Sequence, residues 1–343
     1  MGSIVRLHLL LAAASFAFLP ALSAASSPAS GAEPAAPLVW DMPNEYPATS
    51  LSGDGDRFFA ETLRAASNGR IEVRNHFDAS FGGYRSKDML NAVGSGAVAV
   101  GDAYAGALGD AEPIFLLSSL PFVAVTTEQS RLLAESARDA YERALARHHQ
   151  RLLYVSPWPP SGLWAKRPVT GIAALKDLRI RVYDAGGLTA FKEAGALPVQ
   201  ISFADAIPQL RAGTLDAVLS SGDGGAGAKL WEILPHFTAI NYAMPLSVIS
   251  INEDAWQALA PDLKEAVGKA AATTEARQWR EIVDRLAANG DRLRSNGVTV
   301  TTDLPPDFVQ ALRTAGNAAV DAWIAKAGND GREALDRYRS RLR

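Results

Sequence analysis

The sequence has no cysteine, and this absence excludes disulfides, thiolate metal sites and thiol nucleophiles. Histidine is scarce as well, with five in 343 residues and none at the H-E-x-x-H spacing of a zinc protease. The G-x-S-x-G turn of serine hydrolases is also missing. Carboxylates are plentiful, but no pair is singled out by its context. The sequence therefore favours a binding protein over an enzyme.

Long apolar runs are missing except at the start of the chain. Arg6 precedes an apolar run over Leu9–Leu22, and small residues follow up to Ala25. This pattern predicts an export leader over residues 1–25, cleaved near Ala25, and hence a periplasmic protein. A tether rich in Pro, Ala and Ser would follow over residues 26–37. An uncleaved anchor is the alternative.

A strong excess of charge of either sign is also lacking. The formal net charge is −3 and the isoelectric point is near 6.0, which argues against nucleic-acid binding. Gly222–Lys229 does not meet the spacing of a phosphate-binding loop, and Leu230 stands where that loop needs Ser or Thr. Asp54-Gly55-Asp56 lacks the further ligands of a calcium loop. We expect no cofactor and no metal.

The most informative stretch runs from Leu178 to Ser221. Strands are predicted at residues 180–182, 198–201 and 215–219, with helices over 186–195 and 202–213 between them. Alternation of strand and helix at this spacing indicates parallel pairing, with ligand chemistry at the strand ends.

Two arginines, Arg179 and Arg181, belong to the first of these strands, and we expect one of them to face inward or toward the strand ends. A guanidinium is permanently charged and matches a carboxylate bidentately. An arginine inside such a strand therefore either binds an anion or points outward to solvent, and its chemistry alone favours neither.

Three motifs in this region resemble the DctP-type solute-binding proteins of TRAP (tripartite ATP-independent periplasmic) transporters. They are the R-I-R strand at Arg179–Arg181, the F-A-D helix start at Phe203–Asp205 and the G-T-L-D turn at Gly213–Asp216. S-L-P-F at Ser119–Phe122 adds to the likeness, which extends from about Leu38 to about Ala272. The resemblance implies an extracytoplasmic receptor that passes organic acids to a membrane permease.

The implied fold is α/β, two-lobed and like that of periplasmic binding proteins. Each lobe would be a mixed, mostly parallel sheet flanked by helices, with a long helix touching both lobes. Residues 38–100 repeat the strand–helix order of the central stretch, and 261–296 predict the long helix. Chain crossings near residues 155–161 and 243–250 would form a hinge. We expect lobe I to comprise 38–157 and 247–284, and lobe II 158–246 and 285–343.

The resemblance also suggests site residues. Arg181 stands where the family grips the ligand carboxylate, Phe203 where it often has an aromatic beside the ligand, and Ser220 where it has a polar contact. A core role for Phe203 is the alternative. We expect further ligand contacts from one serine and five aromatic residues: Ser221, Trp158, Trp164, Tyr46, Phe81 and Tyr104.

The chain departs from the family where many members carry a second arginine, since Ser161–Trp164 precede the K-R-P-V segment here. One arginine among aromatic residues predicts a hydrophobic or aromatic monocarboxylate, because a dicarboxylate would leave its second charge unpaired. We therefore predict a monomeric solute-binding protein that delivers such an acid to a TRAP permease. A ligand sensor for a signalling receptor is the alternative, and an exported enzyme a more distant third.

Overall fold

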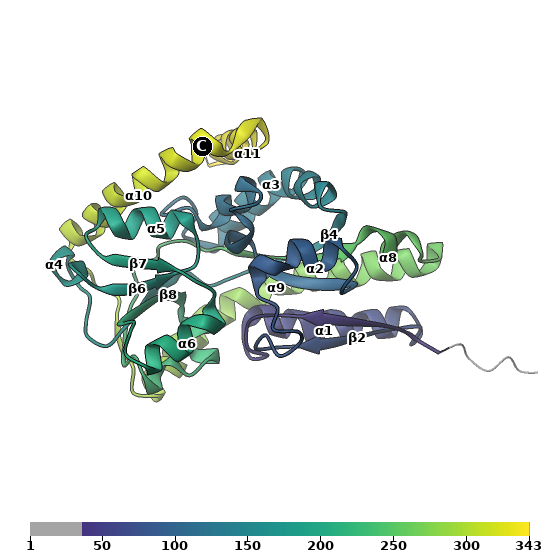
Figure 1. Cartoon of the computed structure of the whole chain (residues 1–343), viewed down its shortest axis with the longest axis horizontal. Helices are drawn as coiled ribbons and strands as arrows, with labels where there is room; N and C mark the ends of the chain where they lie inside the picture. Colours follow the sequence, from purple (N-terminus) through teal and green to yellow (C-terminus); the bar gives the residue numbers. More distant parts are fainter. Residues whose placement is uncertain (1–35, 343) are drawn as a thin grey trace, which may run out of the picture. The chain divides into compact units, whose positions relative to one another are not determined.

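The computed structural model describes residues 36–342. The predicted leader and nearly all of the tether lie outside the described residues. Among the residues that are described, no helix is both long and apolar enough to cross a membrane. The fold is α/β and two-lobed, with mixed sheets flanked by helices (Figure 1).

Eleven strands in the described part of the chain form three sheets. Their bounds are β1 (Leu38–Pro43), β2 (Ile71–His76), β3 (Val100–Tyr104), β4 (Gln150–Pro157), β5 (Ser161–Ala165), β6 (Arg179–Val182), β7 (Leu197–Gln200), β8 (Ala217–Ser221), β9 (His236–Thr238), β10 (Leu246–Asn252) and β11 (Thr299–Thr301).

The α-helices of the same residues are α1 (Leu51–Ala66), α2 (Met89–Gly94), α3 (Thr127–Arg147), α4 (Ile172–Leu175), α5 (Ala185–Glu193), α6 (Phe203–Arg211), α7 (Gly222–Gly227), α8 (Glu253–Gln257), α9 (Pro261–Ser295), α10 (Pro306–Lys326) and α11 (Gly328–Arg341). Short 3-10 helices occur at η1 (Ser86–Asp88), η2 (Ala105–Leu108), η3 (Pro113–Ser119) and η4 (Leu230–Glu232).

The second lobe is built on a six-stranded sheet with the order β11-β9-β5-β8-β6-β7. The three strands β7, β6 and β8 pair in parallel, whereas β5 runs antiparallel to β8 and β9. Figure 1 shows α5 on one side of β6, β7 and β8, and α6 on the other. The predicted parallel unit is thus present, and β5 and β9 extend it on one edge.

The first lobe contains an antiparallel sheet, β3-β10-β4, and a separate parallel pair, β1-β2. Strand β10 returns from the second lobe and pairs between β3 and β4. Its Ile249 and Ile251 are buried with Val100, Tyr154 and Phe59 in one apolar cluster. A chain segment that comes late in the sequence therefore completes the first lobe.

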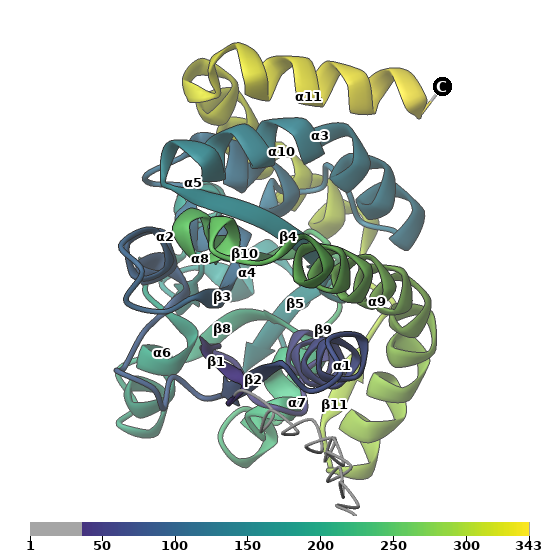
Figure 2. The same ribbon diagram turned by 90° about the vertical axis from the view of Figure 1, so that its right-hand side faces the viewer.

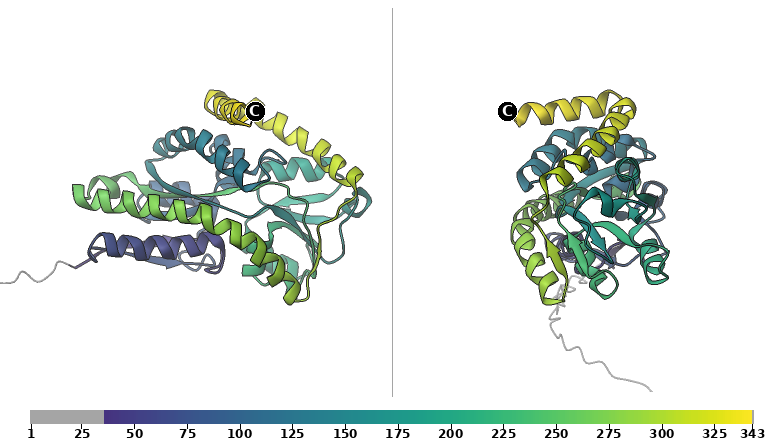
Figure 3. Two further views of the ribbon diagram at one scale, coloured as in Figure 1. Left: turned by 180° about the vertical axis from the view of Figure 1, so that it is seen from behind. Right: turned by 90° about the vertical axis from the view of Figure 1, so that its left-hand side faces the viewer.

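Helix α9 packs against α1, α3 and β4 of the first lobe and against α7 and β11 of the second. Figure 3 shows it running along both lobes from α8 toward β11. This is the long helix that the sequence predicts over residues 261–296. Its first residue is Pro261, which suits a position where no backbone N–H is needed.

The last helix differs from the expected lobe boundary. Helix α10 packs against α5 of the second lobe, but α11 packs along α3 of the first (Figure 2). Leu335 and Tyr338 share a buried cluster with Phe115 and Tyr141. Amphipathic spacing indicates which face of a helix is buried, but not which lobe buries it, so α11 could not be assigned to the first lobe from the sequence.

Candidate functional site

The two arginines of β6 have opposite surroundings. Arg179 lies at the exposed start of β6 and donates two hydrogen bonds of 2.7 Å to Asp216. These bonds lower the pKa of Asp216 to about 2. Arg181 is only 3% exposed and faces the interior between the lobes. Asp216 is thus paired at the surface with Arg179.

Two backbone carbonyls, one just after β7 and one on β8, hold the Arg181 guanidinium. Its Nε donates to the carbonyl of Ile201 at 2.8 Å, and its Nη1 donates to that of Leu219 at 3.3 Å. A guanidinium has five N–H donors, so three remain beyond these two bonds. A fixed cation with spare donors is suited to binding a carboxylate.

Arg181 borders two adjoining cavities. The inner cavity has a volume of about 20 Å³, close to the space that one water molecule needs. Its lining residues are Tyr46, Tyr104, Trp158, Ser161, Arg181, Tyr183, Ser220, Ser221 and Pro245. The outer cavity has a volume of about 350 Å³ and shares Tyr46, Tyr104, Arg181 and Tyr183 with the inner one. Its other lining residues are Glu45, Lys87, Ala107, Asp110, Gln200, Ile201, Ser202 and Asp205.

Aromatic rings form most of the inner wall. The Tyr46 ring lies 4.7 Å from that of Trp158 and 5.3 Å from that of Phe203, measured between centroids. The rings of Tyr104 and Tyr183 are 5.0 Å apart. Trp158 is held in place because its Nε1 donates to Ser247 Oγ at 3.1 Å. The wall is therefore apolar, rigid and contributed by both lobes.

Two tyrosine hydroxyls add polar groups to this wall. Burial raises the pKa of Tyr104 and of Tyr183, so both hydroxyls stay protonated and can donate. The Tyr183 hydroxyl donates to Ser161 Oγ at 3.3 Å. The Tyr104 hydroxyl is buried and has no hydrogen-bond partner within residues 36–342. The Tyr104 hydroxyl lines both cavities and therefore has a donor available at the site.

The predicted serines lie at the carboxyl end of β8. Ser220 and Ser221 both line the inner cavity. The Ser221 hydroxyl also accepts a bond of 3.0 Å from the N–H of Gly224 and so begins helix α7. The glycine-rich segment after these serines is therefore a short helix.

Three of the predicted aromatic contacts lie elsewhere. Trp164 is completely buried behind Ser221, donates to its carbonyl at 3.1 Å and lines neither cavity. Phe81 stacks on His76 at 4.5 Å, away from both cavities, because it packs beside the helix that follows its turn. Phe203 lies behind Tyr46 and 5.5 Å from the Arg181 guanidinium carbon, so it supports the site without lining either cavity.

Tyr183, Ser161 and Glu45 line the cavities but were not predicted. Strand alternation placed residue 183 on the same face as Arg181, so the sequence carried a signal for Tyr183. Ser161 is the first residue of β5, whereas we expected Ser161 to belong to the chain crossing near residues 155–161. Glu45 lies in the loop after β1, where neither periodicity nor charge distinguishes it.

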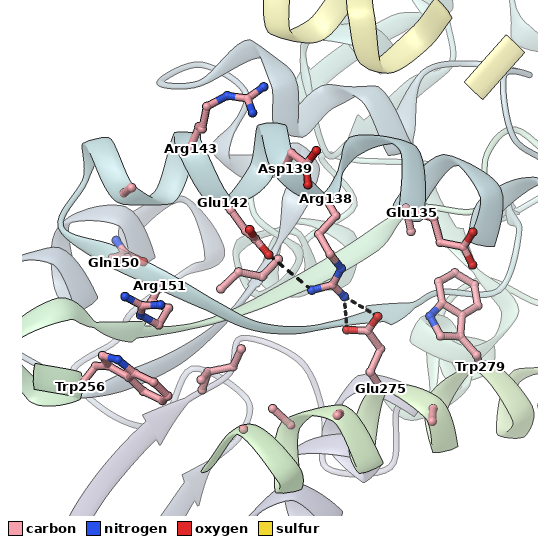
Figure 4. Close-up of a pocket in the computed structure, with 18 of the residues that line it drawn as sticks. Glu135, Arg138, Asp139, Glu142, Arg143, Gln150, Arg151, Trp256, Glu275 and Trp279 are labelled. Carbon is pink, nitrogen blue, oxygen red and sulfur yellow. Dashed lines mark hydrogen bonds and ion pairs between the residues drawn. The ribbon is translucent and has the colours of Figure 1, made fainter. Parts of the chain in front are cut away.

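A larger hollow, of about 890 Å³, lies between α3, β4, α8 and α9. Figure 4 shows Arg138 there between Glu142 and Glu275. Arg138 lies 2.5 Å from Glu275 and 3.8 Å from Glu142. A cation already paired with two carboxylates has little attraction left for an anion, so the cavities at Arg181 are the better candidate site. No group of His, Asp or Glu side chains in residues 36–342 is arranged to hold a metal ion.

The family of the chain follows from comparison with known proteins. The family model described as "Bacterial extracellular solute-binding protein, family 7" (DctP) matches residues 43–327. The chain belongs to this family. Its members are extracytoplasmic receptors for small organic acids that work with TRAP permeases, and they are not enzymes.

Solved structures agree with this assignment. The chain is 30% identical to DctP7, a Bordetella pertussis extracytoplasmic solute receptor binding pyroglutamic acid, with a TM-score of 0.84 over 88% of this chain and 99% of the other. It is also 30% identical to a TRAP solute-binding protein from a marine metagenome, specific for pyroglutamate, with a TM-score of 0.83 over 89% of this chain and 99% of that one. A curated relative, the 2,3-diketo-L-gulonate-binding periplasmic protein YiaO of Escherichia coli, is 23% identical over 78% of this chain and 81% of its own length.

Proposed function

We propose that this protein captures a small monocarboxylate at Arg181 and delivers it to a TRAP permease. The observation that carries the proposal is the buried Arg181 guanidinium, which is fixed by two carbonyls and borders an aromatic-walled cavity. The carboxylate would accept hydrogen bonds from the spare donors of Arg181, each worth about 1.5–3 kcal/mol. The body of the acid would lie against Tyr46, Tyr104 and Tyr183.

The ligand we propose is a single-ring acid, either pyroglutamate or an aromatic monocarboxylate. Two receptors that are 30% identical to this chain are described as binding pyroglutamate. The rings around Arg181 favour a flat, compact ligand, and the Tyr104 hydroxyl suits a carbonyl such as that of a lactam. The small volume of the inner cavity favours a short acid whose ring occupies the outer cavity.

We further propose that the leader is removed near Ala25 and that the mature protein works in the periplasm as a monomer. The apolar run over Leu9–Leu22 and the family assignment support export. Lobe I would comprise 38–157 and 247–284, now with α11 added, and lobe II 158–246 together with 285–326. Closure would occur by bending at the crossings after β4 and before β10.

Calorimetric titration of the purified mature protein tests the proposal. The panel contains L-pyroglutamate, benzoate, glutarate and galactonate, and mass spectrometry of the denatured protein identifies any acid that co-purifies. We expect tight binding of L-pyroglutamate or benzoate. Binding of galactonate or glutarate alone would contradict the proposed ligand class, and failure to bind any organic acid would contradict the function.

A further inference from the structure

Glu45 is a buried carboxylate in the wall of the outer cavity, only 3% exposed. Two backbone N–H groups hold it in place. Ser86 donates to its Oε2 at 2.9 Å, and Ala204 in the first turn of α6 donates to its Oε1 at 3.1 Å. Each oxygen thus uses one of its two lone pairs in these bonds. The side chain is fixed but retains the capacity to accept a hydrogen bond from a ligand.

The other charged residues of this cavity are exposed and already paired. Lys87 contacts Asp88 at 2.8 Å, and Asp205 pairs with Arg85 at 2.9 Å. Asp110 accepts a bond of 3.2 Å from Gln200. Among the charged residues that line the outer cavity, Arg181 and Glu45 are therefore the two that are buried.

We propose that Glu45 determines specificity by repelling a second carboxylate and by accepting an N–H from the ligand. This inference rests on the proposed function, with the ligand carboxylate at Arg181. A dicarboxylate bound to Arg181 would bring its other charge into a poorly solvated space that already holds a fixed anion, which is strongly unfavourable. A ligand with a neutral amide at that end would instead donate to Glu45. The site would thus select one carboxylate and one neutral N–H group.

Two acids of nearly identical shape test this role. Glutarate carries two carboxylates, and its monoamide glutaramate carries one carboxylate and one neutral amide. We expect wild-type protein to bind glutaramate at least about tenfold more tightly than glutarate, since like charges at close range cost more than the 1.4 kcal/mol that tenfold represents. In Glu45→Gln, we expect this preference to fall below about threefold because the repelling charge is gone.

Asp205→Asn is the matched control, because it removes one charge from the same cavity and breaks the link to Arg85. It should change the affinities for the two acids by similar factors and leave their ratio within about twofold, since the exposed charge is screened by solvent. Circular dichroism verifies that each variant is folded, and the wild-type preference tests the proposal independently of any variant.

Equal wild-type affinities for the two acids, or no binding of either, would overturn the role of Glu45. So would an unchanged ratio in Glu45→Gln. If any of these results is found while L-pyroglutamate or benzoate still binds tightly, the proposed function stands and only the role of Glu45 is lost. If no monocarboxylate binds at all, both proposals fail.

Discussion

Arg179 and Arg181 show how two identical side chains, two positions apart, acquire different roles. Both side chains project from the same face of β6, but Arg179 lies at its exposed start, where Asp216 neutralises it. Arg181 lies farther along the strand in the interior, where carbonyl oxygens hold it without neutralising its charge. The interior guanidinium keeps its attraction for an anion because its protein partners are dipoles rather than carboxylates. We therefore expect ligand affinity to depend on Arg181 and not on Arg179.

Replacing Arg181 with lysine should reduce affinity for the bound monocarboxylate by at least about tenfold, because an ammonium cannot form the bidentate pair of a guanidinium. Titration calorimetry measures the loss. Arg179→Lys is the matched control in the same strand and should change affinity by less than about twofold. Equal losses in the two variants would show that Arg181 does not contact the carboxylate.

Asp184 gives a second prediction, on pH dependence. Burial raises the pKa of this carboxyl to about 6, although Ser119 and the N–H of Gly187 donate to it. The folded state therefore binds its proton more tightly than the unfolded state, and the contribution of Asp184 to stability falls as pH rises from about 4 to about 6.

The free energy of unfolding of the wild type should decrease over this pH range. The decrease in Asp184→Asn should be smaller than that in the wild type by about 1–3 kcal/mol. Asparagine caps a helix as well as aspartate does, so α5 should still form. Urea denaturation at pH 4.5 and pH 7 gives the comparison. Asp291→Asn, at an exposed position, should leave the profile as it is, and a parallel profile for Asp184→Asn would contradict the prediction.

The site could be predicted from sequence only where a single residue carries a recognisable signal. A charged residue inside an apolar strand singled out Arg181, and two serines at a strand end singled out Ser220 and Ser221. The sequence did not indicate which aromatic residues would reach the cavity, because an aromatic side chain can equally well fill apolar space elsewhere, as Trp164 and Phe81 do. Side-chain packing decides between these roles, and local sequence does not encode it.

At the scale of elements, periodicity and caps predicted most of the larger helices and strands. Periodicity missed β9, which has only three residues, and it could not show that α7 would be helical. A G-D-G-G-A-G sequence has low helix propensity. Tertiary contacts stabilise α7 instead: Ser221 caps its first turn, and Asp223 accepts a bond of 2.7 Å from the N–H of Leu51.

Gly225 in α7 is required for packing rather than for flexibility. A Cβ there would lie 2.2 Å from Cε2 of the buried Trp164. Gly225→Ala should therefore destabilise the protein by about 1–3 kcal/mol through overpacking, and it should weaken ligand binding because Ser221 lies directly above Trp164. Thermal unfolding and calorimetry measure the two effects.

Gly268→Ala is the control, since Gly268 is exposed within α9 and a Cβ there meets nothing within 4 Å. Alanine should stabilise the helix by about 0.5–1 kcal/mol and leave affinity unchanged. Destabilisation by both variants to the same extent would argue that the contact with Trp164 is unimportant.

At the scale of the whole molecule, Asp223 links the candidate site to both lobes. It is completely buried two residues after Ser221, bonds to the start of α1 and lies 3.1 Å from Arg285 on α9. Arg285 also donates to the carbonyl of Thr49 at 2.9 Å. Opening of the lobes would have to break these contacts, so the contacts of Asp223 and Arg285 should slow ligand release.

Asp223→Asn keeps an acceptor for the N–H of Leu51 but removes the ion pair. It should increase the rate of ligand dissociation by about fivefold or more, as expected for the loss of one charged contact. Stopped-flow displacement of the bound acid gives this rate. Asp54→Asn removes a comparable ion pair, with Arg277, within the first lobe and should leave the dissociation rate unchanged. Similar rates in wild type and Asp223→Asn would contradict the link.

The position of α11 on α3 affects the order in which the chain can acquire structure. Leu335 and Tyr338 complete an apolar cluster whose other members, such as Phe115 and Tyr141, are synthesised some two hundred residues earlier. A nascent chain that still lacks its last helix therefore leaves this surface of α3 uncovered. The first lobe therefore completes this cluster only after α11 has been made.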